Sequence, residues 1–204
     1  MDDVVRLLQR LAEKQPGPLP TFTSTQILGV IMYLGRAGRV GRKRLSMELG
    51  IGEGAIRNIL GRLRASGLVE VEKGGCRLSP EGRRLYSAFS EILIEVGDPE
   101  VKLPWEYPHN YMIIVKGRAG RVRRGLEQRD AAIRAGAEAV MILTYHNGSL
   151  YMPGVVNLSD ERPGFSSQVI GKARPEEGDV IIISGAWSLV DARNGAIAAA
   201  QTLL

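Results

Sequence analysis

The chain has little of what several large protein classes require. Its 204 residues include one cysteine, Cys76, and two histidines. A single cysteine excludes an internal disulfide and a cysteine-rich zinc site. His109 and His146 lack the spacing of a His-Glu-x-x-His metal motif, so we expect no metal and no cofactor. No histidine adjoins Cys76 in the sequence, which argues against a nucleophilic thiol, and we expect no catalytic residues.

Long apolar runs and targeting signals are also missing. No run reaches the roughly 20 apolar residues that span a bilayer, although 44% of the residues are hydrophobic. The start, Met1-Asp2-Asp3, is acidic and lacks the basic-then-apolar pattern of a secretory signal. We therefore expect a cytoplasmic protein with no membrane partner.

Positive charge is present, and it is concentrated in one half of the chain. The net charge is +5. Residues 1–96 hold 15 basic and 10 acidic residues, whereas residues 97–204 hold 12 of each. Localised positive charge is typical of nucleic-acid-binding proteins. A solvated helix face would give the same pattern, so the order of elements must decide between the two.

Residues 21–80 have the pattern of three helices followed by a hairpin. Apolar periodicity predicts helices over residues 24–35, 42–49 and 53–65. Gly50 and Gly67 suit the left-handed backbone that ends the second and third helices. Val69 and Val71 then alternate with glutamates, as in a half-buried strand, and Gly74-Gly75 predicts a hairpin turn.

The third helix has one apolar stripe and one polar face. Its stripe consists of Ile56, Ile59, Leu60 and Leu63. An α-helix fits the major groove of DNA, where arginine suits guanine and asparagine suits adenine. We predict that Arg57, Asn58 and Arg62 face the bases. Basic side chains of the second helix and the hairpin are then expected to hold phosphates: Arg42, Lys43, Arg44, Lys73 and Arg77.

This order of elements resembles the winged helix-turn-helix transcription regulators. The resemblance is carried by residues 54–63 and 67–70, and by Leu78-Ser79-Pro80-Glu81-Gly82. That last segment is similar to the Leu-Thr/Ser-x-x-Gly that closes the wing in many such proteins. The resemblance implies a sequence-specific transcription regulator, not an enzyme, whose partner is double-stranded DNA.

The segments around this region are less specific. Residues 2–14 predict an amphipathic helix that packs within the chain or against a second subunit, and we expect a homodimer because operators are often palindromic. A helix beginning at Pro80 is predicted to end near Gly97. We divide the chain into a winged helix-turn-helix domain over residues 1–96, a linker over 97–110 and an α/β domain over 111–204.

The second half predicts an α/β domain. Continuous apolar runs at 111–115, 139–144 and 180–183 indicate buried strands. A predicted helix over 121–135 joins the first two, which favours a βαβ unit with parallel strands. Residues 153–174 indicate a loop with one strand near Val169-Ile170, and a helix over 189–204 ends the chain. The expected fold class is α+β, with a mixed, partly parallel sheet in the smaller C-terminal domain.

An anion site is predicted where the first strand meets its helix. A glycine-bearing turn there leaves backbone N–H groups free. If the strand over 180–183 runs parallel to the first, the residues after it lie at the same sheet edge. We therefore predict a small anionic effector held by Lys116, Gly117, Arg118, Gly120, Arg121, Ser184 and Gly185. The segment lacks both nucleotide-binding glycine motifs, and a tight turn with solvated arginines is the alternative.

Two further resemblances concern the second half. Residues 178–185 are similar to the Gly-Asp-x-x-Ile-x-Ser-Gly strand of aminoimidazole-ribotide-synthetase-like ATP-binding enzymes, which implies a shared fold without the activity. Residues 126–137 and Tyr151-Met152-Pro153-Gly154 resemble archaeal two-domain winged-helix proteins with an uncharacterised C-terminal α/β domain. Two alternatives stay open: a winged-helix protein-interaction module, or an ATP- or phosphometabolite-binding enzyme with a regulatory winged helix.

Overall fold

The computed structural model describes residues 2–13 and 22–204, with side chains described from Arg6 onward. Lys14 and Thr21, which bound two of the segments predicted above, lie outside the described residues. The chain divides into two compact units, Met1–Ser90 and Glu91–Leu204. Within the described residues, no helix is long and apolar enough to cross a membrane.

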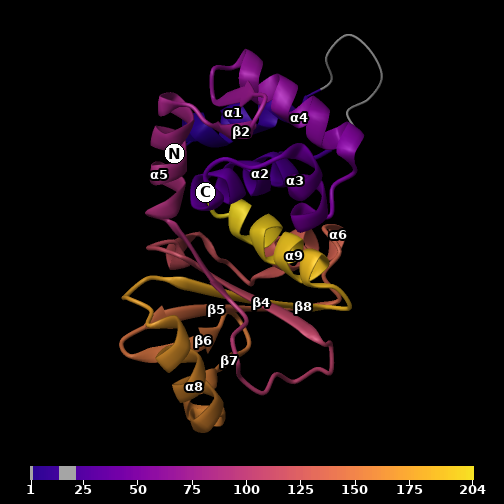
Figure 1. Ribbon diagram of the computed structural model, residues 1–204. Helices are drawn as coiled ribbons and strands as arrows, with labels where there is room; N and C mark the ends of the chain where they lie inside the picture. Colours follow the sequence, from indigo (N-terminus) through magenta and orange to yellow (C-terminus); the bar gives the residue numbers. More distant parts are fainter. Residues whose placement is uncertain (1, 14–21) are drawn as a thin grey trace. The chain divides into compact units, whose positions relative to one another are not determined.

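The first unit is a group of helices with one hairpin (Figure 1). Its elements are α1 (Asp2–Ala12), α2 (Ser24–Ala37), α3 (Arg42–Leu49), α4 (Glu53–Ala65), β1 (Val69–Glu72), β2 (Gly75–Leu78) and α5 (Pro80–Ser90). A capping box between Thr23 and Gln26 starts α2, and Gly50 ends α3 in the left-handed conformation. The three helices and the hairpin predicted for residues 24–78 are therefore confirmed.

The core of this unit comes from the apolar stripes of its helices. Ile27, Leu28, Ile31 and Leu34 of α2 are buried, as is the apolar stripe of α4, and Phe89 of α5 is fully buried. The hairpin is tied to the helices by Val40, which forms an antiparallel bridge with Cys76. The two backbone hydrogen bonds of that bridge measure 2.9 and 2.8 Å. Val40 thereby adds a short third strand beside β2.

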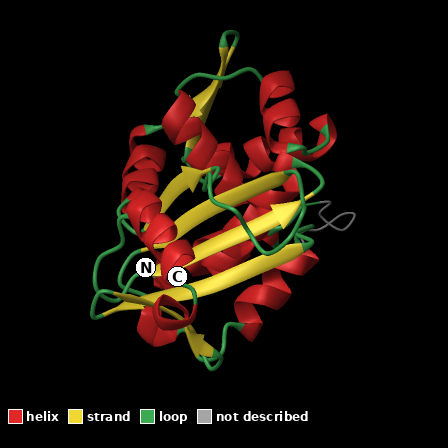
Figure 2. Cartoon of the chain, turned by 90° about the horizontal axis from the view of Figure 1, so that it is seen from below, coloured by secondary structure: helices red, strands yellow, loops and turns green. Residues whose placement is uncertain are grey.

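The second unit is a six-stranded sheet with helices on both faces. Its strands are β3 (Leu93–Gly97), β4 (His109–Val115), β5 (Ala139–His146), β6 (Ser149–Met152), β7 (Val156–Asn157) and β8 (Val180–Ala186). They lie in the order β3-β4-β8-β5-β6-β7, and Figure 2 shows the long strands side by side. Its helices are the 3₁₀ turn η1 (Ala119–Arg121), α6 (Leu126–Arg134), α7 (Leu158–Glu161), α8 (Pro163–Ala173) and α9 (Leu189–Gln201).

Each face of this sheet has its own apolar core. Figure 1 shows α8 and α9 on opposite sides of the strands. On the α8 side, Met112, Ile114, Ile181 and Ile183 pack with Val169. Alternate residues of the same strands point to the α9 side, since successive strand residues face opposite ways. The central strands are apolar on both faces for this reason.

The predicted parallel pairing is wrong. Both β4 and β5 pair with β8, and both pairings are antiparallel, as are all the pairings in this sheet. It follows that β4 and β5 point the same way, as predicted for strands joined by a helix, but β8 lies between them. A continuous apolar run predicts that a strand is buried on both faces. It does not predict which other strand lies beside it.

Three predicted elements differ from the structure. The helix from Pro80 ends at Ser90, and residues 93–97 instead form β3, which pairs with β4 through a bulge at Glu95 and Gly97. The helix expected from residue 121 begins at Leu126, after Gly125 adopts a left-handed backbone. Val169 and Ile170 lie in the helix α8, whose first residue is Pro163. Proline suits that position because its missing N–H has no partner there.

Candidate nucleic-acid interface

The helix α4 has one buried side and one exposed, polar side. Ile56, Ile59, Leu60 and Leu63 are buried on its inner side. Arg57 and Asn58 are exposed on the opposite side, as predicted from the periodicity. Gly54 and Gly61 flank them, and a Cβ atom added to either glycine would meet nothing within 4 Å. Another molecule can therefore approach the α4 backbone closely at both positions.

The predicted phosphate contacts of α3 are also exposed. Leu45 and Leu49 bury the inner side of this helix, which leaves Arg42, Lys43 and Arg44 at its solvent side. Arg44 lies 3.7 Å from the carboxylate of Glu48, one turn along the helix. Such an exposed pair is weak and readily exchanged. The structure thus presents three cations on α3, of which Arg42 and Lys43 form no ion pair among the described residues.

Arg62 does not share the outer face with Arg57 and Asn58, contrary to the prediction. Its guanidinium donates hydrogen bonds to the carbonyl oxygens of Leu11 and Glu13, the latter at 2.7 Å. It also lies over the ring of Phe22, 4.9 Å from the ring centre. A cation at the C-terminal end of α1 satisfies carbonyl groups that have no partner within that helix. Arg62 therefore joins α4 to α1.

Of the predicted hairpin cations, only Lys73 extends into solvent at the turn. The guanidinium of Arg77 lies 2.8 Å from Glu70 and 3.4 Å from Glu72. Glu72 also contacts Arg39, at 2.9 Å. Arg77 is predicted to hold phosphate because it lies near the turn of the expected hairpin. Their register places Arg77 opposite Glu70.

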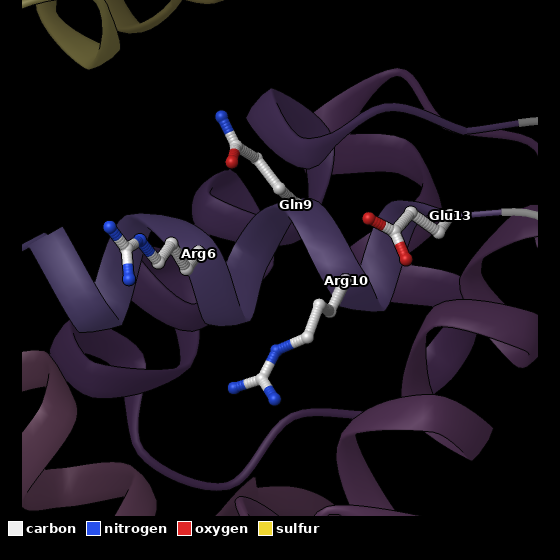
Figure 3. A pocket seen from close by; sticks show the side chains of 4 residues that line it. All are labelled: Arg6, Gln9, Arg10 and Glu13. Atoms are coloured by element: carbon white, nitrogen blue, oxygen red, sulfur yellow. The ribbon is translucent and has the colours of Figure 1, made fainter.

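The exposed side of α1 lines a shallow hollow of about 520 Å³. Figure 3 shows the described residues that border it, which are Arg6, Gln9, Arg10 and Glu13. The two arginines are one helical turn apart. The hollow is open, and the side chains described at its border are all polar or charged.

In the second unit, the predicted anion site already holds a carboxylate of the chain itself. Asp179 is 1% exposed and accepts hydrogen bonds from the Gly117 N–H and the Lys116 ammonium, each at 2.9 Å. It also accepts the Glu176 N–H at 2.8 Å. Burial lowers the pKa of Lys116, but hydrogen bonds to Glu176 and Asp179 outweigh it, so the pKa is raised overall. Two of the residues predicted to bind an effector, Lys116 and Gly117, instead bind Asp179.

Ser184 and Gly185 do not join this loop. Because β8 runs antiparallel to β4, Gly185 pairs with Asn110 at the opposite end of the strand from Lys116. The Ser184 hydroxyl is fully buried, within hydrogen-bonding distance of the carbonyl oxygens of Tyr111 and Ala192. Gly185 lies beneath Trp105, whose indole nitrogen would be 2.4 Å from an added Cβ. Both residues therefore have structural roles within the second unit.

The remaining residues of the predicted site are dispersed. Arg121 donates a hydrogen bond of 2.7 Å to the carbonyl oxygen of Leu204. Gly120 is exposed, and Arg118 is half-buried. A neighbouring hollow of about 300 Å³ at the start of α6 is bordered by Arg123, Arg124 and residues 125–128. No group of three or more histidine, cysteine or acidic residues is placed to hold a metal ion within the described part of the chain.

The comparisons with known proteins follow the same two units. Residues 26–84 match a family model described as PH0730-like, N-terminal domain. Residues 107–203 match one described as a domain of unknown function, DUF4443. No curated protein matches this chain.

One solved structure extends the likeness across both units. The hypothetical protein PH0730 from Pyrococcus horikoshii OT3 has 27% sequence identity and a TM-score of 0.69. The match covers 89% of this chain and 92% of that protein. The expected likeness to archaeal two-domain proteins is confirmed to this extent. The chain is therefore similar over both of its units to an archaeal two-domain protein, and residues 26–84 of its first unit match the PH0730-like N-terminal domain model.

Proposed function

We propose that this chain is a sequence-specific DNA-binding transcription regulator, without enzymatic activity, whose first unit is a winged helix-turn-helix. The observation that carries the proposal is the outer face of α4. It combines exposed Arg57 and Asn58 with bare backbone at Gly54 and Gly61. An α-helix with such a face suits the major groove, where side chains reach base edges only if the backbone comes close.

The proposal divides the basic residues by task. Arg57 reads guanine and Asn58 reads adenine, each through paired hydrogen bonds to one base edge. Arg42, Lys43 and Arg44 of α3, with Lys73 of the hairpin, hold phosphates and set the register of the helix. We do not include Arg62 among the base-reading residues, because it binds the end of α1.

The second unit has a smaller part in the proposal. We propose that the regulator is cytoplasmic and acts as a homodimer on a two-fold symmetric operator, as many such proteins do. The small anionic effector predicted from the sequence loses its support at residues 116–121, because Asp179 occupies Lys116 and Gly117. We assign no ligand to this unit.

The test is selection of bound fragments from random duplex DNA by the purified full chain. The matched variants are Arg57→Ala, for base reading, and Lys43→Ala, for phosphate binding. We expect an enriched motif with the unaltered chain. Arg57→Ala should cost about 1–3 kcal/mol on that motif and relax one base position. Lys43→Ala should weaken binding to all sequences alike and reduce the salt slope by about 1.

The outcomes separate the candidate functions. A two-fold symmetric motif supports the homodimer, and a single half-site contradicts it. If Arg57→Ala enriches the same motif as the unaltered chain, α4 is not the helix that reads the bases. Binding that follows salt alone, with no enriched motif, would instead favour a winged-helix module that contacts other proteins.

A further inference from the structure

We infer that Glu70 and Glu72 hold Arg77 of the hairpin and Arg39 beside it away from DNA phosphate and thereby lower the affinity of the free protein for non-specific duplex. This inference rests on the proposed DNA-binding function. It assigns a regulatory role to two acidic residues, whereas the proposed function concerns only basic and amide side chains.

The register of the hairpin brings two cations together. Val40 pairs antiparallel with Cys76. The residue before Val40 is Arg39, and the residue after Cys76 is Arg77, so the two arginines come side by side. Gly74 at the turn lies against Arg39, whose terminal nitrogen would be 3.1 Å from an added Cβ. Like charges at neighbouring positions of a sheet repel each other unless an anion lies between them.

Glu72 supplies that anion. Its Oε2 atom lies 2.9 Å from Arg39 Nη2, and its Oε1 atom lies 3.4 Å from Arg77 Nη2. Glu70 completes the cluster, because Arg77 Nε donates to Glu70 Oε2 at 2.8 Å. Two carboxylates thus neutralise two guanidinium groups. The Glu72 carboxylate occupies the position between two arginines that a DNA phosphate would otherwise take.

The cluster can exchange partners because it is at the surface. The side chains of Arg39, Glu72, Arg77 and Glu70 are 42, 46, 43 and 40% exposed. A phosphate can therefore reach either arginine, but only by displacing a carboxylate. Cations that are already paired add little to the counterion release that drives non-specific binding. The hairpin then presents Lys73 alone as an unpaired cation among its described residues.

The experiment measures binding of the full chain to a random-sequence 20-base-pair duplex across a salt series. The test variant is Glu70→Gln/Glu72→Gln, which keeps side-chain size and removes both negative charges. The control is Glu81→Gln/Glu91→Gln, which changes the net charge equally. It also releases Arg84, which Glu81 pairs with on α5, outside the hairpin. A third variant adds Arg39→Gln/Arg77→Gln to the test variant.

We expect the test variant to bind more tightly than the control. Each freed arginine should steepen the slope of log affinity against log salt by about 0.9, which at 0.1 M salt is about an 8-fold gain. Relative to the unaltered chain, two freed arginines should give a gain of up to about 60-fold. The gain should vanish in the variant that also lacks Arg39 and Arg77. The thermal unfolding midpoint of each variant shows whether it is folded. If the double variant does not fold, the single variant Glu72→Gln is tested in its place.

The possible failures are distinguishable. If the unaltered chain binds duplex but the test variant matches its charge-equal control, the inference is overturned and the proposed function stands. If the test variant alone binds, the inference is supported. If neither binds duplex at any salt concentration, the proposed function fails and the inference fails with it.

Discussion

Gly82 lies directly against the backbone of Leu68. A Cβ atom at Gly82 would come 2.0 Å from the Leu68 carbonyl oxygen, much closer than atoms can pack. Nearby, the Ser79 hydroxyl donates to the Gly67 carbonyl at 2.6 Å and accepts the Gly82 N–H at 3.0 Å. These contacts explain the Leu-Ser-Pro-Glu-Gly pattern physically. The serine caps α5 and ties it to the chain before the hairpin, and the glycine lets α5 approach.

From this contact we predict that Gly82→Ala destabilises the first unit. Because the obstacle is backbone, the helix must shift, and overpacking of this kind costs about 1–3 kcal/mol. The matched control is Gly61→Ala, another helical glycine, which has nothing within 4 Å. Alanine should stabilise that site by about 0.5–1 kcal/mol through its helix propensity. Urea unfolding of both variants checks the pair, and equal effects would contradict the contact.

Replacement of Arg62 by alanine should loosen α1. The side chain donates to two carbonyl oxygens at the end of that helix, and hydrogen bonds from charged groups contribute about 1.5–3 kcal/mol. Arg64→Ala is the control, because Arg64 is exposed on the same helix. Hydrogen exchange should show faster exchange at the amides of α1 in Arg62→Ala alone. Unchanged protection of α1 would refute the anchoring role.

Gly185→Ala should displace Trp105. The added methyl group would lie 2.4 Å from the Trp105 indole nitrogen and 3.0 Å from Asn110 Oδ1. That indole N–H donates a hydrogen bond of 2.8 Å to Asn110 Oδ1. Tryptophan fluorescence should shift to the red as the ring becomes solvated.

The fluorescence measurement is best made with Trp187→Phe, because Trp187 is 68% exposed and would add a background signal. Gly171→Ala in α8 is the control, since a Cβ there meets nothing within 4 Å. A shift of the same size in both variants would count against the packing of Trp105 on Gly185.

The carboxylate of Glu177 should titrate below the ordinary range. Hydrogen bonds from His146 and from the Asn147 N–H lower the pKa of Glu177 from its usual value of 4.5. A depressed pKa in the folded state means that the carboxylate stabilises the fold above about pH 4.5. That contribution is lost as pH falls through the lower, folded-state pKa.

NMR titration of Glu177 checks this directly. In His146→Ala the pKa should return part of the way to 4.5, because the Asn147 N–H still donates. In Glu177→Gln the decline of stability below pH 4.5 should become shallower. An unaltered Glu177 pKa in His146→Ala would show that the histidine does not cause the shift.

The local sequence pattern was sufficient to predict a residue's position wherever that position depends on neighbours in the chain. The apolar stripe of α4 follows from residues three and four apart, and it also places Arg57 and Asn58 outside. Gly50 ended a helix as expected, because glycine tolerates the left-handed backbone. The central strands β4, β5 and β8 of the second unit were recognisable because such strands are apolar on both faces.

The amino-acid sequence alone was therefore enough to predict the helices and hairpin of the first unit, the buried strands of the second, and the exposed polar face of α4. Tertiary structure alone decided the pairing of β8 between β4 and β5, and with it the separation of Ser184 and Gly185 from Lys116. It also decided that Arg62 binds α1, that Arg77 binds glutamate, and that Asp179 fills the expected anion site. Each of these depends on a partner distant in sequence. A charged group binds whichever of these partners lies close to it, and only the folded chain determines which one that is.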